Sequence, residues 1–200
     1  DRREEDFLGW TLLSIAPLNQ ERIEKFVSMW FGESDKGIEL LRKIQSPRIS
    51  ELATRAFLLA LICLVFEDDR DIGTNRSSLY EQSTLYLEQS RLKTATNKLR
   101  ELRREVLKEI ALRFLQLDCK ELDEQFLSAI VYGALNGGRE RKSPKEFLEE
   151  LATETGLLQN YGGYYGFTHQ SFQEYYAALA LKDMANGKDL LLAYCQVPQW

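Results

Sequence analysis

The feature that most constrains the fold is an uninterrupted apolar run, FLLALICLVF, at residues 57–66. A helix that is apolar on every side has to be buried, either in the core of a domain or in a membrane. A membrane-spanning helix takes about 20 apolar residues, so this shorter run predicts a central helix of a globular domain and no membrane partner. We expect Leu61 and Leu64 in this helix to be almost fully buried.

Most of the remaining chain has the apolar spacing of amphipathic helices. Ser46 and Pro47 form a helix start signal, and the helix or helix pair that begins there leads through the apolar run. Ser143 and Glu146 form a capping box around Pro144, which marks another start. The pattern predicts further helices around residues 20–30, 38–44, 77–89, 99–117 and 122–132.

After Leu151 the residue pattern is no longer that of an amphipathic helix. Gly162 and Gly163 lie between two short apolar and aromatic stretches, which predicts a β-hairpin over residues 157–167. A helix follows from about Ser171. The predicted fold is therefore mainly α, a helical bundle followed by a winged-helix domain with a short β-hairpin.

Charge and cysteine content narrow the function classes. The net charge of −5 gives the protein as a whole no attraction to nucleic acid or to anionic membranes. The three cysteines are far apart and form no CxxC pair, so neither a zinc site nor a disulfide framework is expected. A reducing, cytoplasmic location agrees best with this pattern.

His169 is the only histidine of the chain, and it precedes Ser171 and Glu174. A hydrolase triad would need these three side chains to converge, but offsets of two and five residues on a helix point them apart. The chain has no GxxxxGK[ST] phosphate-binding loop, and the acidic stretch EDDRD lacks the spacing of a calcium loop. We therefore expect no catalytic residue, no metal site and no enzymatic activity of this chain by itself.

A winged-helix shape raises DNA binding as an alternative function. If the helix after the hairpin entered a DNA groove, it should present basic residues, yet residues 170–181 contain none. The basic run at residues 139–145 is more simply explained as a solvated loop. Nucleic acid is thus an unlikely partner, although a DNA-binding winged-helix regulator and a pure protein-interaction module both stay open as alternatives.

The stretch GLLQNYGGYYGFTHQSFQEYYAALAL at residues 156–181 resembles the winged-helix end of NACHT-family NTPases, which are relatives of the NOD-like receptors. IAPLNQERIEKFVSMWF, FLLALICLVFED and LYEQSTLYLEQ are similar to the segments that follow the NTPase core in that family. The resemblance implies a helical domain over residues 1–90 and a winged-helix domain with its linking helices over residues 91–200. It also implies that the NTPase core lies N-terminal of Asp1.

The resemblance implies a function as a regulatory nucleotide switch in signalling or defence. In the family, the histidine at the position of His169 contacts the β-phosphate of ADP, so His169 is expected to be a phosphate sensor. Ala56 stands where the family has a proline against the adenine, which puts nucleotide affinity in question. The expected cofactors are ADP or ATP with Mg²⁺ in the intact protein and none in this chain alone. The expected partners are the NTPase core of the same protein and, on activation, further copies of it.

Overall fold

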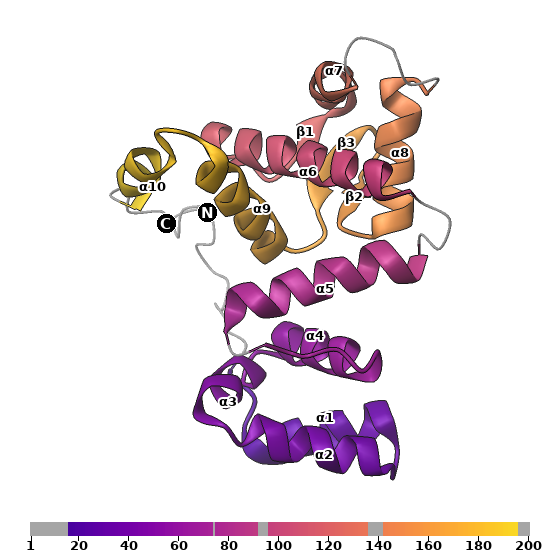
Figure 1. Ribbon diagram of the computed structural model, residues 1–200, viewed down its shortest axis with the longest axis vertical. Coiled ribbons are helices and arrows are strands. Elements are labelled where there is room, and N and C mark those ends of the chain that lie inside the picture. Colours follow the sequence, from indigo (N-terminus) through magenta and orange to yellow (C-terminus); the bar gives the residue numbers. More distant parts are fainter. Residues whose placement is uncertain (1–15, 74, 92–95, 136–141, 196–200) are drawn as a thin grey trace, which may run out of the picture. The chain divides into compact units, whose positions relative to one another are not determined.

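The computed structural model describes residues 16–73, 75–91, 96–135 and 142–195, which form two compact units that divide between Leu79 and Tyr80. The first unit is helical, and its elements are drawn in indigo and purple in Figure 1: α1 (Gln20–Phe31), α2 (Asp35–Ile44), α3 (Pro47–Ala53), α4 (Ala56–Glu67) and the beginning of α5 (Arg76–Arg91). The domain boundary expected between residues 90 and 91 stays a prediction.

The helix expected from Pro47 onward is a pair of helices, α3 and α4. Thr54 closes α3 because its Oγ1 donates a hydrogen bond to the carbonyl of Glu51 at 2.7 Å. Arg55 then adopts an extended backbone, with φ −100° and ψ 117°, and α4 begins at the next residue. The apolar run thus starts a helix of its own.

Helix α4 is the core of the first unit, as the sequence predicts. Leu61 is 5% exposed, and Leu58, Ile62 and Val65 are also buried. The expectation for Leu64 was wrong, since this side chain is only half-buried. Burial, with a smaller contribution from Glu67, raises the pKa of Cys63 to about 12, so this thiol stays protonated at neutral pH.

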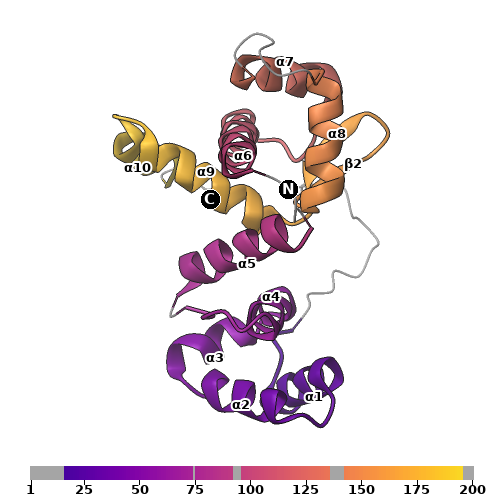
Figure 2. The same cartoon turned by 45° about the vertical axis from the view of Figure 1, so that its right-hand side comes forward.

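The second unit has the winged-helix arrangement (Figures 1 and 2). Three short antiparallel strands pair in the order β1–β3–β2, and α9 packs along α6. The predicted fold class is therefore confirmed. The elements are α6 (Asn97–Leu117), β1 (Leu122–Asp123), α7 (Glu124–Ala134), α8 (Pro144–Thr155), β2 (Leu158–Asn160), β3 (Tyr164–Phe167), α9 (Gln170–Asp183) and α10 (Gly187–Cys195).

The start of α7 differs from the sequence-based expectation of one helix from Leu122. Leu122 and Asp123 form strand β1, in which Leu122 pairs with Tyr165 and Asp123 pairs with Tyr164. Asp123 is also the N-cap of α7, since its carboxylate accepts a hydrogen bond from the backbone N–H of Phe126 at 2.9 Å. This strand is two residues long and exists because β3 pairs with it.

Helices α8 and α9 are tied to α6 by ion pairs that are partly buried. Arg103 of α6 is 2% exposed and pairs with Glu154 of α8 at 2.5 Å. Lys108 of α6 pairs with Asp183, the last residue of α9, also at 2.5 Å. Burial acts to lower the pKa of Lys108, but its hydrogen bonds with Asp183 and Glu105 outweigh burial and raise it. Both pairs hold the helices that flank the hairpin on one scaffold helix.

Candidate functional site

The candidate site is the start of α9, immediately after the hairpin. Strand β3 ends at Phe167, and Thr168 then fixes the chain to the other end of the hairpin. The backbone N–H of Thr168 donates to the carbonyl of Leu157 at 2.9 Å, and its hydroxyl donates to the carbonyl of Gly156 at 3.1 Å. His169 therefore follows an anchored residue.

His169 is the N-cap of α9. Its backbone is extended, with φ −147° and ψ 134°, and its Nδ1 accepts a hydrogen bond from the backbone N–H of Ser171 at 3.1 Å. The His169 carbonyl accepts the N–H of Phe172 at 3.0 Å. The sequence analysis placed the start of this helix at about Ser171 and so missed this role of the imidazole.

The capping bond fixes the chemistry of the imidazole. A nitrogen that accepts a hydrogen bond carries no proton, so a neutral His169 has its proton on Nε2, where it can act as a donor. The orphan N–H groups and the dipole of a helix start favour an anion. The first turn of α9 contains no acidic residue that would oppose one. A phosphate oxygen is a suitable acceptor at such a position.

The helix beneath this site is held by an aromatic cluster. Phe172 and Tyr176 of α9 are 3% and 1% exposed. Phe172 lies edge-on to Tyr80 with ring centroids 5.7 Å apart, and Tyr176 lies against Phe167 at 6.2 Å. The cluster fixes the direction of α9 and with it the position of its first residue.

Ala56, the second residue expected to contact nucleotide, lies in the first unit. It is exposed and is the first residue of α4, after the extended Arg55. Proline favours the first position of a helix and an extended residue before it. The turn that a proline would impose is thus present although the proline is absent. His169 and Ala56 belong to different units.

The serine and glutamate near His169 form no triad with it. Ser171 is buried and contributes its backbone N–H, whereas Glu174 accepts a hydrogen bond from the side chain of Gln170 at 3.2 Å. Among the residues that the structure describes, no three His, Cys, Asp or Glu side chains gather into a potential metal site. None of the helices in those ranges combines the length and apolar character that a bilayer crossing requires.

The sequence analysis judged the DNA-binding alternative from the helix after the hairpin, which is not the helix that would enter a DNA groove. In a helix-turn-helix the second helix reads the groove. Here that pair is α7 and α8, so the reading helix lies before the hairpin and is not α9. The exposed residues of α8 include Glu146, Glu149 and Thr153, with one lysine, Lys145. This acidic surface would repel phosphate.

The basic run next to α8 is largely neutralised where the structure describes it. Lys142 pairs with Glu150 at 2.5 Å, and Lys145 pairs with Glu124 at 2.8 Å. Residues 139–141 of the run lie outside the described ranges. The charges of these two lysines are therefore compensated by ion pairs within the domain.

Comparison with known proteins gives one family. Residues 61–181, from α4 to the end of the buried part of α9, match the family described as a winged helix-turn-helix domain C-terminal to NACHT. The matched residues are more than half of the chain and include His169. No curated protein matches the chain.

Proposed function

Because the chain belongs to the family of winged helix-turn-helix domains C-terminal to NACHT, we propose that it is the regulatory segment of a NACHT-type signalling or defence NTPase. In this proposal a NACHT core of the same protein binds and hydrolyses the nucleotide, and the winged helix senses it. With ADP bound the segment stays closed on the core. With ATP and Mg²⁺ it opens, and copies of the protein assemble in the cytoplasm.

The observation that carries this proposal is that one nitrogen of the His169 imidazole caps the helix and leaves the proton on the other. Nδ1 caps α9, at 3.1 Å from the N–H of Ser171, and this bond directs the proton to Nε2. An Nε2–H at a helix start is a donor for the β-phosphate of ADP. Such a bond, partly charge-assisted, contributes roughly 1–3 kcal/mol. It forms only in the closed state, so it favours that state alone.

The proposal is tested with a protein that contains both the NACHT core and these 200 residues. At a protein concentration too low for weak self-association, sedimentation should show single copies with ADP and larger assemblies with ATP and Mg²⁺. His169→Leu should assemble already with ADP, because the closed state loses a bond that changes the closed-to-open ratio by roughly 5- to 150-fold. A wild-type protein whose assembly ignores the nucleotide would overturn the proposal. If His169→Leu assembles only with ATP and Mg²⁺, as the wild type should, His169 has no part in the nucleotide switch.

Ala56 gives a second arm of the same experiment. The extended Arg55 and the helical Ala56 already have the backbone that a proline requires. Ala56→Pro should therefore leave the fold intact and tighten ADP binding by the intact protein, if position 56 lies against the adenine. Unchanged ADP affinity in a folded variant would show that this position makes no adenine contact.

A further inference from the structure

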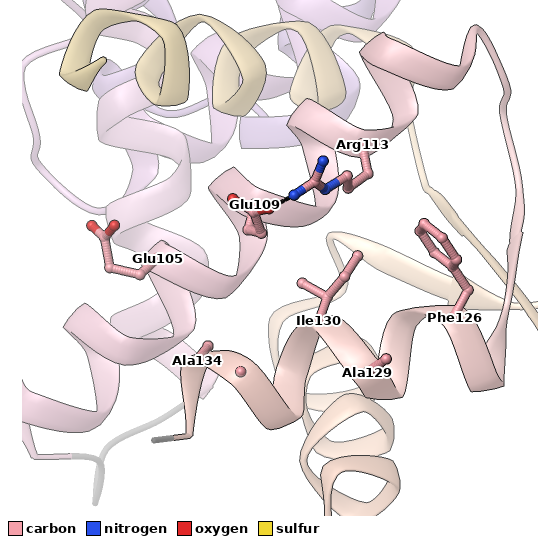
Figure 3. Close-up of a pocket in the computed structure, with 8 residues that line it drawn as sticks. Glu105, Glu109, Arg113, Phe126, Ala129, Ile130 and Ala134 are labelled. Carbon is pink, nitrogen blue, oxygen red and sulfur yellow. Dashed lines mark hydrogen bonds and ion pairs between the residues drawn. The ribbon is translucent and has the colours of Figure 1, made fainter. Parts of the chain in front are cut away.

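A groove of about 730 Å³ lies between α6 and α7 in the second unit (Figure 3). One wall is charged: Glu105, Glu109 and Arg113 follow one another along α6. The other wall is apolar, because α7 supplies residues at helical spacing, namely Phe126, Ala129, Ile130, Gly133 and Ala134. Phe126 is 40% exposed, so a large part of its ring is accessible in the groove. Nothing in the proposed function uses this face.

The two ends of the groove differ in size and in charge. Figure 3 shows Arg113 near Phe126 at one end and Glu105 near Ala134 at the other. The large ring and the positive charge thus share one end, and small residues and a negative charge share the opposite end. At Gly133 a Cβ would meet no atom within 4 Å, so this end is open.

A two-fold axis through the middle of the groove exchanges its two ends. The ring of Phe126 from one copy would then meet the open space at Gly133 of the other copy. In the same arrangement Arg113 would face Glu105 across the interface, twice. The two ends of the surface are complementary to each other in both shape and charge. In the middle Glu109 would face Glu109 of the second copy, and each carboxylate accepts a hydrogen bond from its own Arg113 at 2.7 Å. We propose that this groove is the interface between two copies of this chain, with α7 packed antiparallel against the second α7.

The side chains that would pair are able to do so. Arg113 uses Nη2 to bind Glu109 at 2.7 Å and Nη1 to bind Gln116 at 2.9 Å, and a guanidinium has five N–H donors in total. The side chain of Glu105 is 62% exposed, although it also pairs with Lys108 at 2.7 Å. Small residues at positions 129 and 133 let two helix backbones approach closely. Since α7 has 11 residues, the interface is smaller than a standard one, and association should be weak and sensitive to salt.

The test is sedimentation equilibrium of the 200-residue chain over a wide concentration range. The wild type should show a monomer–dimer equilibrium. Arg113→Glu and Glu105→Arg should each raise the dissociation constant at least about tenfold, since each places like charges together at both symmetric contacts. The double variant Arg113→Glu/Glu105→Arg should return to within about threefold of the wild type, because the pair is restored with exchanged signs. Glu149→Arg on α8 is the matched charge-reversal control and should associate as the wild type does.

A second variant tests the shape of the groove without a change of charge. Gly133→Leu fills the open end and should prevent dimers, while the thermal unfolding temperature stays the same or rises. Thr153→Leu adds a leucine to the exposed face of α8, away from the groove, and should leave the dissociation constant unchanged. The proposal is overturned if the wild type stays monomeric at every concentration, as it would if the groove held a helix of another protein. It is equally overturned if dimers survive Gly133→Leu or if the double charge reversal restores nothing.

Discussion

Helices α8 and α9 flank the same hairpin, but they begin in different ways. At α8, the Ser143 hydroxyl accepts the N–H of Glu146 at 3.2 Å, and the Glu146 carboxylate accepts the N–H of Ser143 at 2.9 Å. In this capping box both backbone N–H groups have their acceptor within the protein. At α9 the cap is His169, which accepts one N–H through Nδ1. Histidine is not among the residues that best cap helices, and an imidazole has a second nitrogen.

In the proposed function, this difference separates a helix start that stabilises the fold from one that binds a ligand. The capping box brings a carboxylate to the start of α8, where it complements the helix dipole. The first turn of α9 has no carboxylate that would complement the dipole. We therefore expect substitutions at α8 to affect folding alone and substitutions at His169 to affect nucleotide binding.

The largest expected effects on stability come from one buried phenylalanine in each of the two helices, and the two losses should be equal. Phe147 of α8 and Phe172 of α9 are 2% and 3% exposed. Phe147→Ala and Phe172→Ala should each lower the free energy of unfolding by about 3–5 kcal/mol. Denaturant unfolding measures both. A much smaller loss for Phe172→Ala would mean that α9 is not held by its buried face, and the comparison of the two starts would lose its common basis.

Ser143→Ala should have the next largest effect. It removes the hydroxyl that accepts the Glu146 N–H, and the loss of such a cap costs about 1 kcal/mol of stability. The denaturant midpoint should fall accordingly, with an unchanged slope. A midpoint equal to that of the wild type would show that the capping box does not stabilise α8.

The pH dependence of stability should show the other half of the capping box. The backbone hydrogen bond from Ser143 holds the pKa of Glu146 below its ordinary value of 4.5. A carboxylate with a lowered folded pKa stabilises the protein above pH 4.5, and this contribution is lost as the pH falls through the lowered value. Glu146→Gln should therefore make the unfolding free energy less dependent on pH below 4.5. Identical acid profiles for the two proteins would contradict this account of Glu146.

The smallest expected effect on stability is that of His169→Asn. Asparagine is among the best N-cap residues, so it replaces the Nδ1 acceptor and keeps α9 capped. The free energy of unfolding of the 200-residue chain should change by less than about 0.5 kcal/mol. His169→Leu, which has no acceptor, should be less stable than His169→Asn. If both variants are equally stable, the capping bond contributes nothing measurable.

Local signals explain which parts of the fold could be predicted. The capping box at Ser143, the hairpin around Gly162 and Gly163, and the apolar helix all depend on neighbouring residues, and the structure has all three. Strand β1 could not be predicted, because two residues have no periodicity and their pairing partner, Tyr164–Tyr165, is distant in the sequence. The half-buried state of Leu64 could not be predicted either, because the packing of distant segments decides which side of an apolar helix is covered.

The role of His169 in nucleotide binding stays a prediction, and its local geometry could be anticipated only in part. The sequence points to His169 because it is the single histidine at the junction of hairpin and helix, and the resemblance supplies its role as a phosphate sensor. Its capping bond was missed because the residues that usually cap, Thr168 and Ser171, lie on either side. The helix that would read DNA was placed after the hairpin because β1, which reveals the order of a winged helix, was not recognised. The position of His169, directly before the helical stretch QSFQEYYAALAL, is the sequence signal that could have identified the cap.

The most direct test measures ADP affinity by calorimetry in a protein with the NACHT core and three versions of this segment: wild type, His169→Asn and Ser143→Ala. Both variants keep α9 capped, but only His169→Asn removes the imidazole Nε2–H. We predict that His169→Asn weakens ADP binding roughly 5- to 150-fold, the equivalent of 1–3 kcal/mol, and that Ser143→Ala leaves it within about twofold. If His169→Asn binds ADP as tightly as the wild type, His169 is a helix cap and nothing more.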